Sequence, residues 1–296
     1  MKAWIAALAL LVPTGAWAQD CPPAGWDRAR LEALRDADFA IDDPAVRTRF
    51  VEGLIACLAS PDPFLRDAIG FEGLSRMLRA GRIDDPAKTR MARALLDRLG
   101  GDDPDGFGRP FAALVLAEIV RADRVARYLP DDLRMAIVDG AADYVAGVRD
   151  YRGFDEGEGW RHGVAHGADL LMQIAANPHI GDPARLTRVR DAIAAQVAPA
   201  GHSYIYGEPE RLMLPVILLA RRGLFTEAEW TAWFAELAAP APLAAWGEAF
   251  QSQAGLARRH NLRAFLHAVW RNARIGANTE DDVLLPGAEA ALRATS

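Results

Sequence analysis

Asp-Pro pairs recur along this chain and constrain its fold more than any other feature. They stand at residues 43–44, 62–63, 85–86, 103–104 and 182–183. An aspartate accepts hydrogen bonds from the free amides of a helix N-terminus, and proline fits the first helical turn. Each pair therefore predicts the start of a helix.

The spacing of these pairs indicates how the helices are arranged. The first four pairs are 19, 23 and 18 residues apart, which suits one helix and one turn per step. Two steps make a helical hairpin of about 40 residues, the size of a HEAT-like repeat. The sequence thus favours antiparallel helical hairpins stacked as a HEAT-like curved solenoid, with an irregular helical bundle as the alternative.

Apolar residues at 3-4 spacing support an all-α fold, as in Phe50, Leu54 and Leu58 after the first Asp-Pro pair. No segment shows the sustained alternation of a β-strand. Further helices are expected over residues 110–122, 131–148, 159–176, 183–197, 209–222, 226–238 and 245–273.

The N-terminus has the features of a secretory signal peptide. Lys2 precedes an apolar run over residues 3–12, and Ala16-Trp17-Ala18 matches a cleavage site. The run is about half the roughly 20 residues that cross a bilayer. We expect residues 1–18 to be removed, leaving residues 19–296 as one periplasmic or secreted domain without a membrane span.

Export affects the chemistry of Cys21 and Cys57, the two cysteines of the chain. An oxidising compartment lets thiols pair, so we predict a disulfide between them. The alternative is two unpaired thiols, with Cys57 buried in an apolar helix. A formal net charge of −6 at pH 7 and a pI of about 5.6 argue against nucleic acid as a main partner.

Residues 149–169 combine glycines, charged residues, aromatic residues and histidines, and we expect this loop to become a helix near Glu158 or Gly159. His162, His166 and Asp169 would then project from one stripe, at i, i+4 and i+7. This set suits zinc or another divalent metal, with Glu156 or Glu210 as a general base. The alternative is the polar face of an amphipathic helix.

A second polar cluster lies in residues 201–211 and includes His202, Tyr204, Tyr206, Glu208, Glu210 and Arg211. Stacked repeats would place it beside the 162/166/169 stripe and form a polar groove. Its alternative is a helix cap with an internal Glu–Arg pair. On the last long helix, His260, Arg263 and His267 share one face, which we expect to be solvated or packed between repeats.

Five blocks occur in an order that resembles the bacterial family catalogued as domain of unknown function 2785, over about residues 50–272. The most specific block supplies Arg152, Gly153, Glu156, Gly157, Gly159, Trp160, His162, His166 and Asp169. The other blocks span residues 60–67, 107–114, 208–212 and 261–266. The resemblance implies an all-helical protein with a shared polar block and implies no activity.

Three functional hypotheses follow. The leading one is a groove that binds a small molecule, peptide or glycan, and it assigns contacts to Trp160, His202, Tyr204, Tyr206 and Glu208, and anion binding to Arg109, Arg152 and Arg211. The second is a metal-dependent hydrolase that uses His162, His166 and Asp169. The third is a purely structural or interaction solenoid.

Overall fold

The computed structural model describes residues 21–296, which are predominantly α-helical. The α-helices are α1 (Arg28–Asp36), α2 (Pro44–Cys57), α3 (Glu72–Arg79), α4 (Asp85–Gly100), α5 (Gly108–Val125), α6 (Asp131–Gly147), α7 (Gly163–Ala176), α8 (Pro183–Val197), α9 (Glu208–Ala220), α10 (Glu227–Leu237), α11 (Gln253–Ile275) and α12 (Leu285–Ala294). The remaining elements are a π-helical segment η1 (Phe64–Phe71), the 3-10 segments η2 (Trp246–Gln251) and η3 (Thr279–Leu284), and the strands β1 (Phe154–Asp155) and β2 (Gly159–Trp160). The prediction of an all-α protein is confirmed.

Two Asp-Pro pairs start helices in the expected way. The Asp43 carboxylate accepts the amides of Ala45 and Val46 at 2.7 and 3.2 Å, at the start of α2. Asp182 accepts the two corresponding amides of α8 at 3.0 and 3.3 Å. Local capping chemistry therefore sets these two helix starts.

The Asp103-Pro104 pair departs from this pattern. Helix α5 begins at Gly108, and the Asp103 carboxylate reaches over the intervening loop to the amides of Gly108 and Arg109, at 3.0 and 2.9 Å. Asp84 caps α4, one residue earlier than expected. The helix expected over residues 245–273 is divided into η2 and α11, because Ser252 adopts an extended conformation and caps α11. The sequence thus indicates the capping residues, but it does not indicate how many residues separate the cap from the start of the helix.

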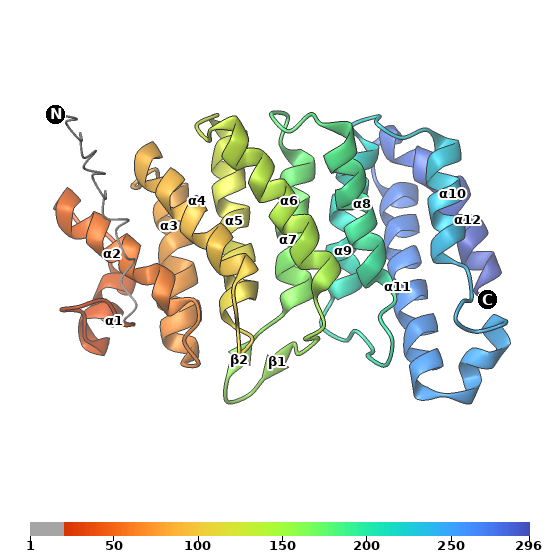
Figure 1. Ribbon diagram of the computed structural model, residues 1–296, viewed down its shortest axis with the longest axis horizontal. Coiled ribbons are helices and arrows are strands. Elements are labelled where there is room, and N and C mark those ends of the chain that lie inside the picture. The colour runs from red at the N-terminus through yellow and green to blue at the C-terminus, as the bar shows by residue number, and fades with distance from the viewer. Residues whose placement is uncertain (1–20) are drawn as a thin grey trace, which may run out of the picture.

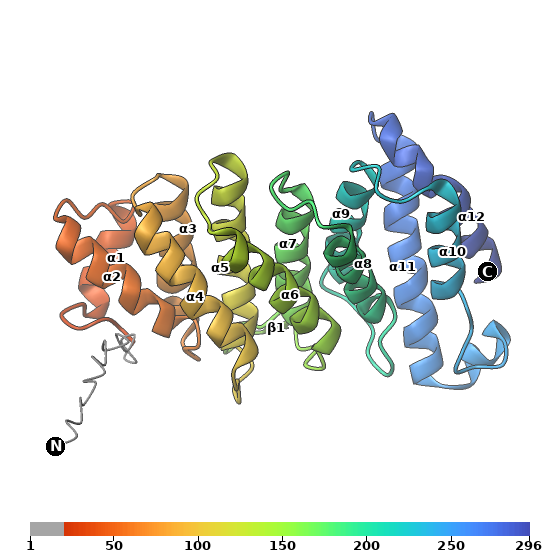
Figure 2. The same cartoon turned by 45° about the horizontal axis from the view of Figure 1, so that its top comes forward.

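The helices form two layers that follow the chain order along the long axis (Figure 1). In one layer α3, α5, α7, α9 and α11 contact one another in succession, and in the other α2, α4, α6 and α8 do so. Contacts of α4 with α5, α6 with α7 and α8 with α9 join the layers. At the C-terminal end α10, α11, α12 and η3 pack together (Figure 2). Side chains of successive helices within one layer therefore lie next to one another on the surface of that layer.

Buried apolar side chains form a cluster that extends from Leu31 to Ala291 and crosses both layers. Cys21 and Cys57 are joined by a disulfide, as predicted, which ties the first described residues to α2. The signal peptide expected at residues 1–18 lies outside the described residues. Within residues 21–296, no helix combines the length and the apolar character needed to cross a membrane.

Candidate functional site

Residues 152–162 form a β-hairpin, where the sequence suggested a helix from residue 158 or 159. Strand β1 pairs with β2 antiparallel, and the amides of Arg161 and His162 extend the pairing to the carbonyls of Gly153 and Arg152, at 2.9 and 3.1 Å. Gly159, with φ +74°, and His162, with φ +55°, adopt left-handed conformations that no α-helix accommodates. Helix α7 therefore begins only at Gly163.

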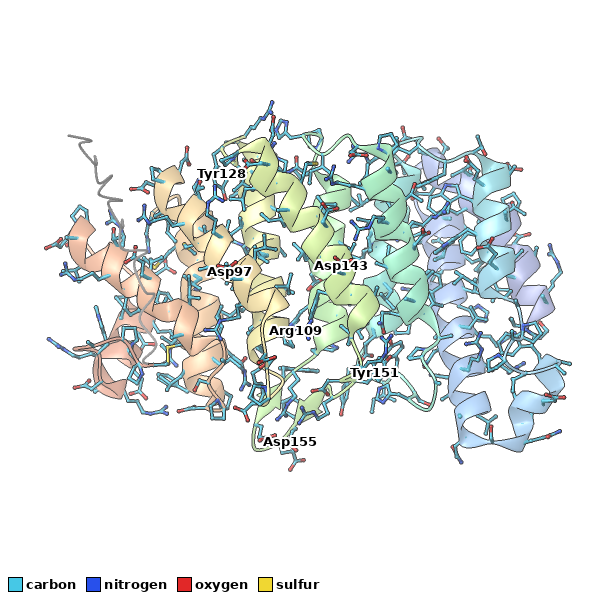
Figure 3. The ribbon with its side chains drawn as sticks, in the orientation of Figure 1. Asp97, Arg109, Tyr128, Asp143, Tyr151 and Asp155 are labelled. Carbon is cyan, nitrogen blue, oxygen red and sulfur yellow. A yellow bond between two sulfur atoms is a disulfide. The ribbon has the colours of Figure 1, made fainter. Side chains whose placement is uncertain are left out.

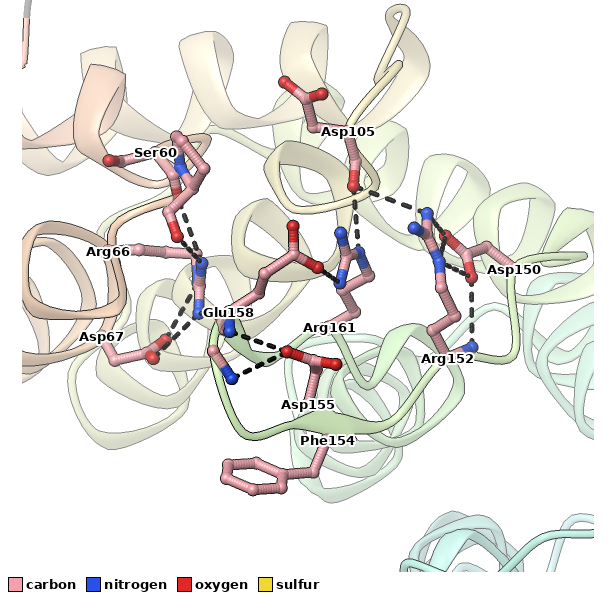
Figure 4. Close-up of polar contacts among 12 residues, drawn as sticks. Ser60, Arg66, Asp67, Asp105, Asp150, Arg152, Phe154, Asp155, Glu158 and Arg161 are labelled. Carbon is pink, nitrogen blue, oxygen red and sulfur yellow. Dashed lines mark hydrogen bonds and ion pairs between the residues drawn. The ribbon is translucent and has the colours of Figure 1, made fainter.

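Two buried arginines fasten this hairpin (Figure 4). Arg66 ties it to η1, and Arg161, whose Nε donates to the Asp105 carbonyl at 3.0 Å, ties it to the loop before α5. The Arg66 guanidinium donates to the Glu158 carbonyl at 2.6 Å and pairs with Asp67 at 3.0 Å. Arg161 pairs with the Glu158 carboxylate at 2.8 Å. Both guanidinium groups lie over the Phe107 ring, 4.1 and 4.0 Å from its centroid. The hairpin is thus held in one position relative to the helices.

His162 and His166 lie side by side at the N-terminus of α7, with ring centroids 5.7 Å apart. Burial, helped by the positive charge of Arg211, lowers the pKa of His162 to about 4. Burial, together with nearby positive charges, lowers the pKa of His166 to about 3. Both imidazoles are therefore neutral at pH 7. His162 Nε2 and His166 Nδ1 are buried and have no hydrogen-bond partner among residues 21–296.

An ion pair joins α7 to α9 next to these histidines. Arg211 Nε donates to Asp169 Oδ1 at 2.6 Å, and Arg211 Nη2 donates to Asp169 Oδ2, so that the pair is bidentate. Burial raises the pKa of Asp169 even though Arg211 opposes this shift. Glu208 is also buried, and its carboxylate accepts the Tyr206 amide at 2.9 Å and lies 3.7 Å from His162 Nε2.

Three aromatic side chains cover this polar group on the solvent side. Phe154, Trp160 and Tyr206, which we call the aromatic patch, are 45%, 37% and 36% exposed. The Trp160 ring stacks on His162 with centroids 4.7 Å apart and an interplanar angle of 22°. The Trp160 ring also lies 5.0 Å from the Phe154 ring and 5.5 Å from the Tyr206 ring, measured between centroids, and the Tyr206 ring is nearly perpendicular to it. The patch and the buried histidines therefore form one continuous group.

Gly153 makes this arrangement possible, since a Cβ atom there would lie 2.0 Å from Tyr206 Cδ2. We expect Gly153→Ala to displace Tyr206 from the patch and to cost about 1–3 kcal/mol of the free energy of unfolding, as overpacking does. Urea denaturation and near-ultraviolet circular dichroism would measure both effects. Gly157→Ala is the matched control, because its Cβ would meet only Asp155 Oδ1, at 3.4 Å. Equal stability and spectra for the two variants would contradict the prediction.

The structure brings together seven of the residues singled out from the sequence: Trp160, His162, His166, Asp169, Tyr206, Glu208 and Arg211. The two candidate bases are not among them. Glu156 and Glu210 are exposed and make no hydrogen bond or ion pair with either histidine. His202 stacks on Tyr151, with centroids 5.2 Å apart.

Two predicted ligand contacts have other roles. Tyr204 is buried, donates its hydroxyl to the Gln196 carbonyl at 2.9 Å, and supports the loop before α9 rather than lying on its surface. Arg152 pairs with Asp150 at 2.5 Å, near the tip of the loop before α5. Both side chains are therefore engaged in intramolecular contacts.

Arg109, which is labelled in Figure 3, lines a separate cavity of about 200 Å³. Tyr144, Asp150 and Arg161 also line this cavity. Arg109 Nε donates to the Leu99 carbonyl at 2.9 Å. No residue of the aromatic patch lines this cavity. Arg109 thus lies outside the group formed by the patch and the two histidines.

The predicted metal site at His162, His166 and Asp169 is not supported. No three His, Cys, Asp or Glu side chains within residues 21–296 are arranged to hold a metal ion. The helical stripe was wrong at its first position, because His162 precedes α7 in a left-handed conformation. Asp169 is bound to Arg211 on the next helix of its layer.

Arg66 and Phe107 position the hairpin, and the sequence did not single out either of them for this role. Both lie in blocks that carry the family resemblance, which is the one signal that pointed to them. A fully buried arginine on an aromatic ring needs long-range contacts, here 92 residues along the chain to Glu158. Helical periodicity cannot indicate such contacts.

Comparison with known proteins places the chain in a family without assigning an activity. No curated protein and no solved structure matches it. A family model described as protein of unknown function (DUF2785) matches residues 95–270, which include the hairpin, both histidines, Asp169 and Arg211. More than half of the chain is matched, so the protein belongs to the DUF2785 family.

Proposed function

We propose that this chain is an exported binding protein that holds its ligand at the aromatic patch and the adjoining histidines, without chemical turnover. The apolar segment and cleavage motif at the N-terminus, together with the Cys21–Cys57 disulfide, support a periplasmic or secreted location. The two layers of successively contacting helices support a HEAT-like curved solenoid as its architecture.

The observation that carries this proposal is the pair of unpartnered imidazole nitrogens. Buried polar atoms nearly always have a hydrogen-bond partner, and leaving one unpaired costs about 1–3 kcal/mol. His162 Nε2 and His166 Nδ1 both lack one within residues 21–296, and both rings are neutral. A neutral imidazole has one donor and one acceptor nitrogen. A ligand with hydroxyl groups would supply the missing partners once it displaces the Trp160 ring that covers His162.

The surrounding residues favour a sugar within the class of small molecules, peptides and glycans. Trp160 and Tyr206 offer partly exposed aromatic surface for the apolar face of a sugar ring. Arg211 uses Nε and Nη2 on Asp169, which leaves Nη1 for a ligand oxygen. Aromatic stacking combined with a few fixed polar groups is typical of a small-ligand site.

Ligand binding to Trp160 tests the proposal. Neutral and acidic oligosaccharides would be titrated into the protein while tryptophan fluorescence is recorded, with calorimetry as the second measurement. We expect at least one oligosaccharide to bind, and Trp160→Ala to weaken that binding at least about tenfold, because a central aromatic contact contributes about 2 kcal/mol.

Val125→Ala is the control, since Val125 is strongly exposed at the end of α5, outside the patch. It should bind the same oligosaccharide as tightly as the unaltered chain. Binding that is unchanged in Trp160→Ala, or no binding by any oligosaccharide, would refute the proposal.

A further inference from the structure

Helix α11 is strongly basic in an otherwise acidic chain. Its 23 residues include Arg258, Arg259, Arg263, Arg271 and Arg274 and two histidines, with no aspartate or glutamate. The whole chain has a formal net charge of −6 at pH 7. Positive charge is thus concentrated on one helix, at the end of the layer formed by α3, α5, α7, α9 and α11.

Most of these side chains share one side of the helix. Arg259, His260, Arg263, His267 and Arg271, which we call the basic face, follow one another at intervals of one to four residues, and none of them is buried. Four of them line a cavity of about 480 Å³, together with Ser203 from the loop before α9. No acidic residue lines this cavity. Its size suits a ligand larger than a single small ion.

The charge of the basic face is not neutralised within residues 21–296. No carboxylate forms an ion pair with any of its five residues. Arg263 donates to the Thr295 carbonyl at 3.0 Å, which caps α12 and leaves the charge in place. Arg259 Nε is buried without a hydrogen-bond partner. Cationic side chains that line a cavity without an acidic partner favour an anionic ligand.

The basic face and the aromatic patch are linked by the loop of residues 201–207. Asn261 of α11 holds this loop, since it accepts the Tyr204 amide at 2.9 Å and donates to the His202 carbonyl at 2.7 Å. Ser203 borders the cavity, and Tyr206 belongs to the patch. Three residues of chain span at most about 11 Å. Ser203 and Tyr206 therefore lie within the length of one extended ligand.

We infer that the ligand of the proposed site is an acidic oligosaccharide. Its sugar rings stack on Trp160 and Tyr206, and its anionic groups bind Arg259, Arg263 and Arg271. The inference rests on the proposed function, because it names the ligand class of the same site. A sugar chain carries ring faces for the patch and charged groups for the arginines along one molecule, which an isolated anion does not.

The test compares acidic oligosaccharides with their uncharged forms. Uronic-acid, sialylated and sulfated oligosaccharides would be titrated beside the methyl ester, the asialo form and the desulfated form. At low salt we expect an acidic form to bind at least about tenfold more tightly than its neutral form. This difference should shrink as salt screens the arginines.

The variant that tests the basic face is Arg259→Glu/Arg271→Glu. It should weaken binding of the acidic form at least about tenfold and leave the neutral form within about twofold. Arg49→Glu/Arg93→Glu is the control, since it makes the same change of charge at two exposed arginines of α2 and α4 that form no ion pair within residues 21–296. Thermal melting would establish that both variants are folded.

The outcomes separate the inference from the proposed function. Equal binding of acidic and neutral forms, with both lost in Trp160→Ala, overturns the inference and leaves the binding function intact. Binding of acidic forms that Trp160→Ala does not weaken overturns the function. A short oligo-aspartate peptide that binds the basic face more tightly than every acidic oligosaccharide also overturns the inference.

Discussion

Arg134→Ala is expected to lower the free energy of unfolding by about 3–5 kcal/mol, because it leaves a buried carboxylate without its cation. Arg134 Nε donates to Asp123 Oδ2 at 2.8 Å, and both side chains are almost completely buried. Asn177 and the Leu129 amide also donate to Asp123, each at 2.9 Å. Urea denaturation at neutral pH would measure the loss.

The pH dependence of this loss identifies its cause. Burial opposes ionisation of Asp123, but hydrogen bonds from Arg134 and its other donors outweigh burial and lower its pKa from 3.8 to about 2. Because folding lowers the pKa of Asp123, ionised Asp123 stabilises the folded chain at pH values above its pKa in the unfolded chain. This stabilisation disappears as the pH falls from about 4 to about 2. The difference between Arg134→Ala and the unaltered chain should therefore shrink over that range.

Arg127→Ala is the matched control, since Arg127 forms an exposed pair with Asp131, four residues along. Exposed pairs of this kind contribute about 0.3–0.5 kcal/mol. If Arg134→Ala and Arg127→Ala lower the free energy of unfolding by the same small amount, the buried pair of Arg134 and Asp123 does not stabilise the fold as proposed.

Removal of the disulfide is expected to cost about 3–4 kcal/mol of the free energy of unfolding, because the bond restricts the unfolded chain. Cys21 and Cys57 are 36 residues apart. The bond holds the first described segment on α2, where the Trp26 and Phe50 rings are 4.7 Å apart. The variant Cys21→Ser/Cys57→Ala, compared with the unaltered chain by urea denaturation, would measure the cost.

A reducing agent supplies the control for this experiment. It should destabilise the unaltered chain by a similar amount and leave the variant unchanged, because the variant has no disulfide to reduce. A variant as stable as the oxidised chain would show that the bond does not contribute to folding stability.

The family block shows what a sequence contains about a site and what it lacks. Trp160, His162, His166 and Asp169 were singled out together, and the structure brings them together. Their expected helical arrangement was wrong for Trp160 and His162, which belong to the hairpin and its end. Helical periodicity describes neighbours within one helix. It cannot indicate that the chain reverses direction in a hairpin before the helix begins.

The partner of Asp169 illustrates the same limit. Arg211 was predicted to bind anions from a ligand, and in the folded chain it binds Asp169, 42 residues earlier in the sequence. This pairing depends on how α7 packs against α9, which follows from the burial of apolar surface by both helices. The type of a residue indicates its chemistry, but it does not indicate which of several oppositely charged residues will be its partner.

The sequence by itself determined the helical fold, several helix starts, the disulfide and the residues gathered at the site. These features depend on local chemistry, such as capping at Asp43 and Asp182, or on having only two cysteines. Only the tertiary structure decided the hairpin, the neutral buried histidines, the burial of Tyr204 and the cavity beside α11. Burial and long-range pairing arise when distant segments exclude water together, and no single segment carries that information.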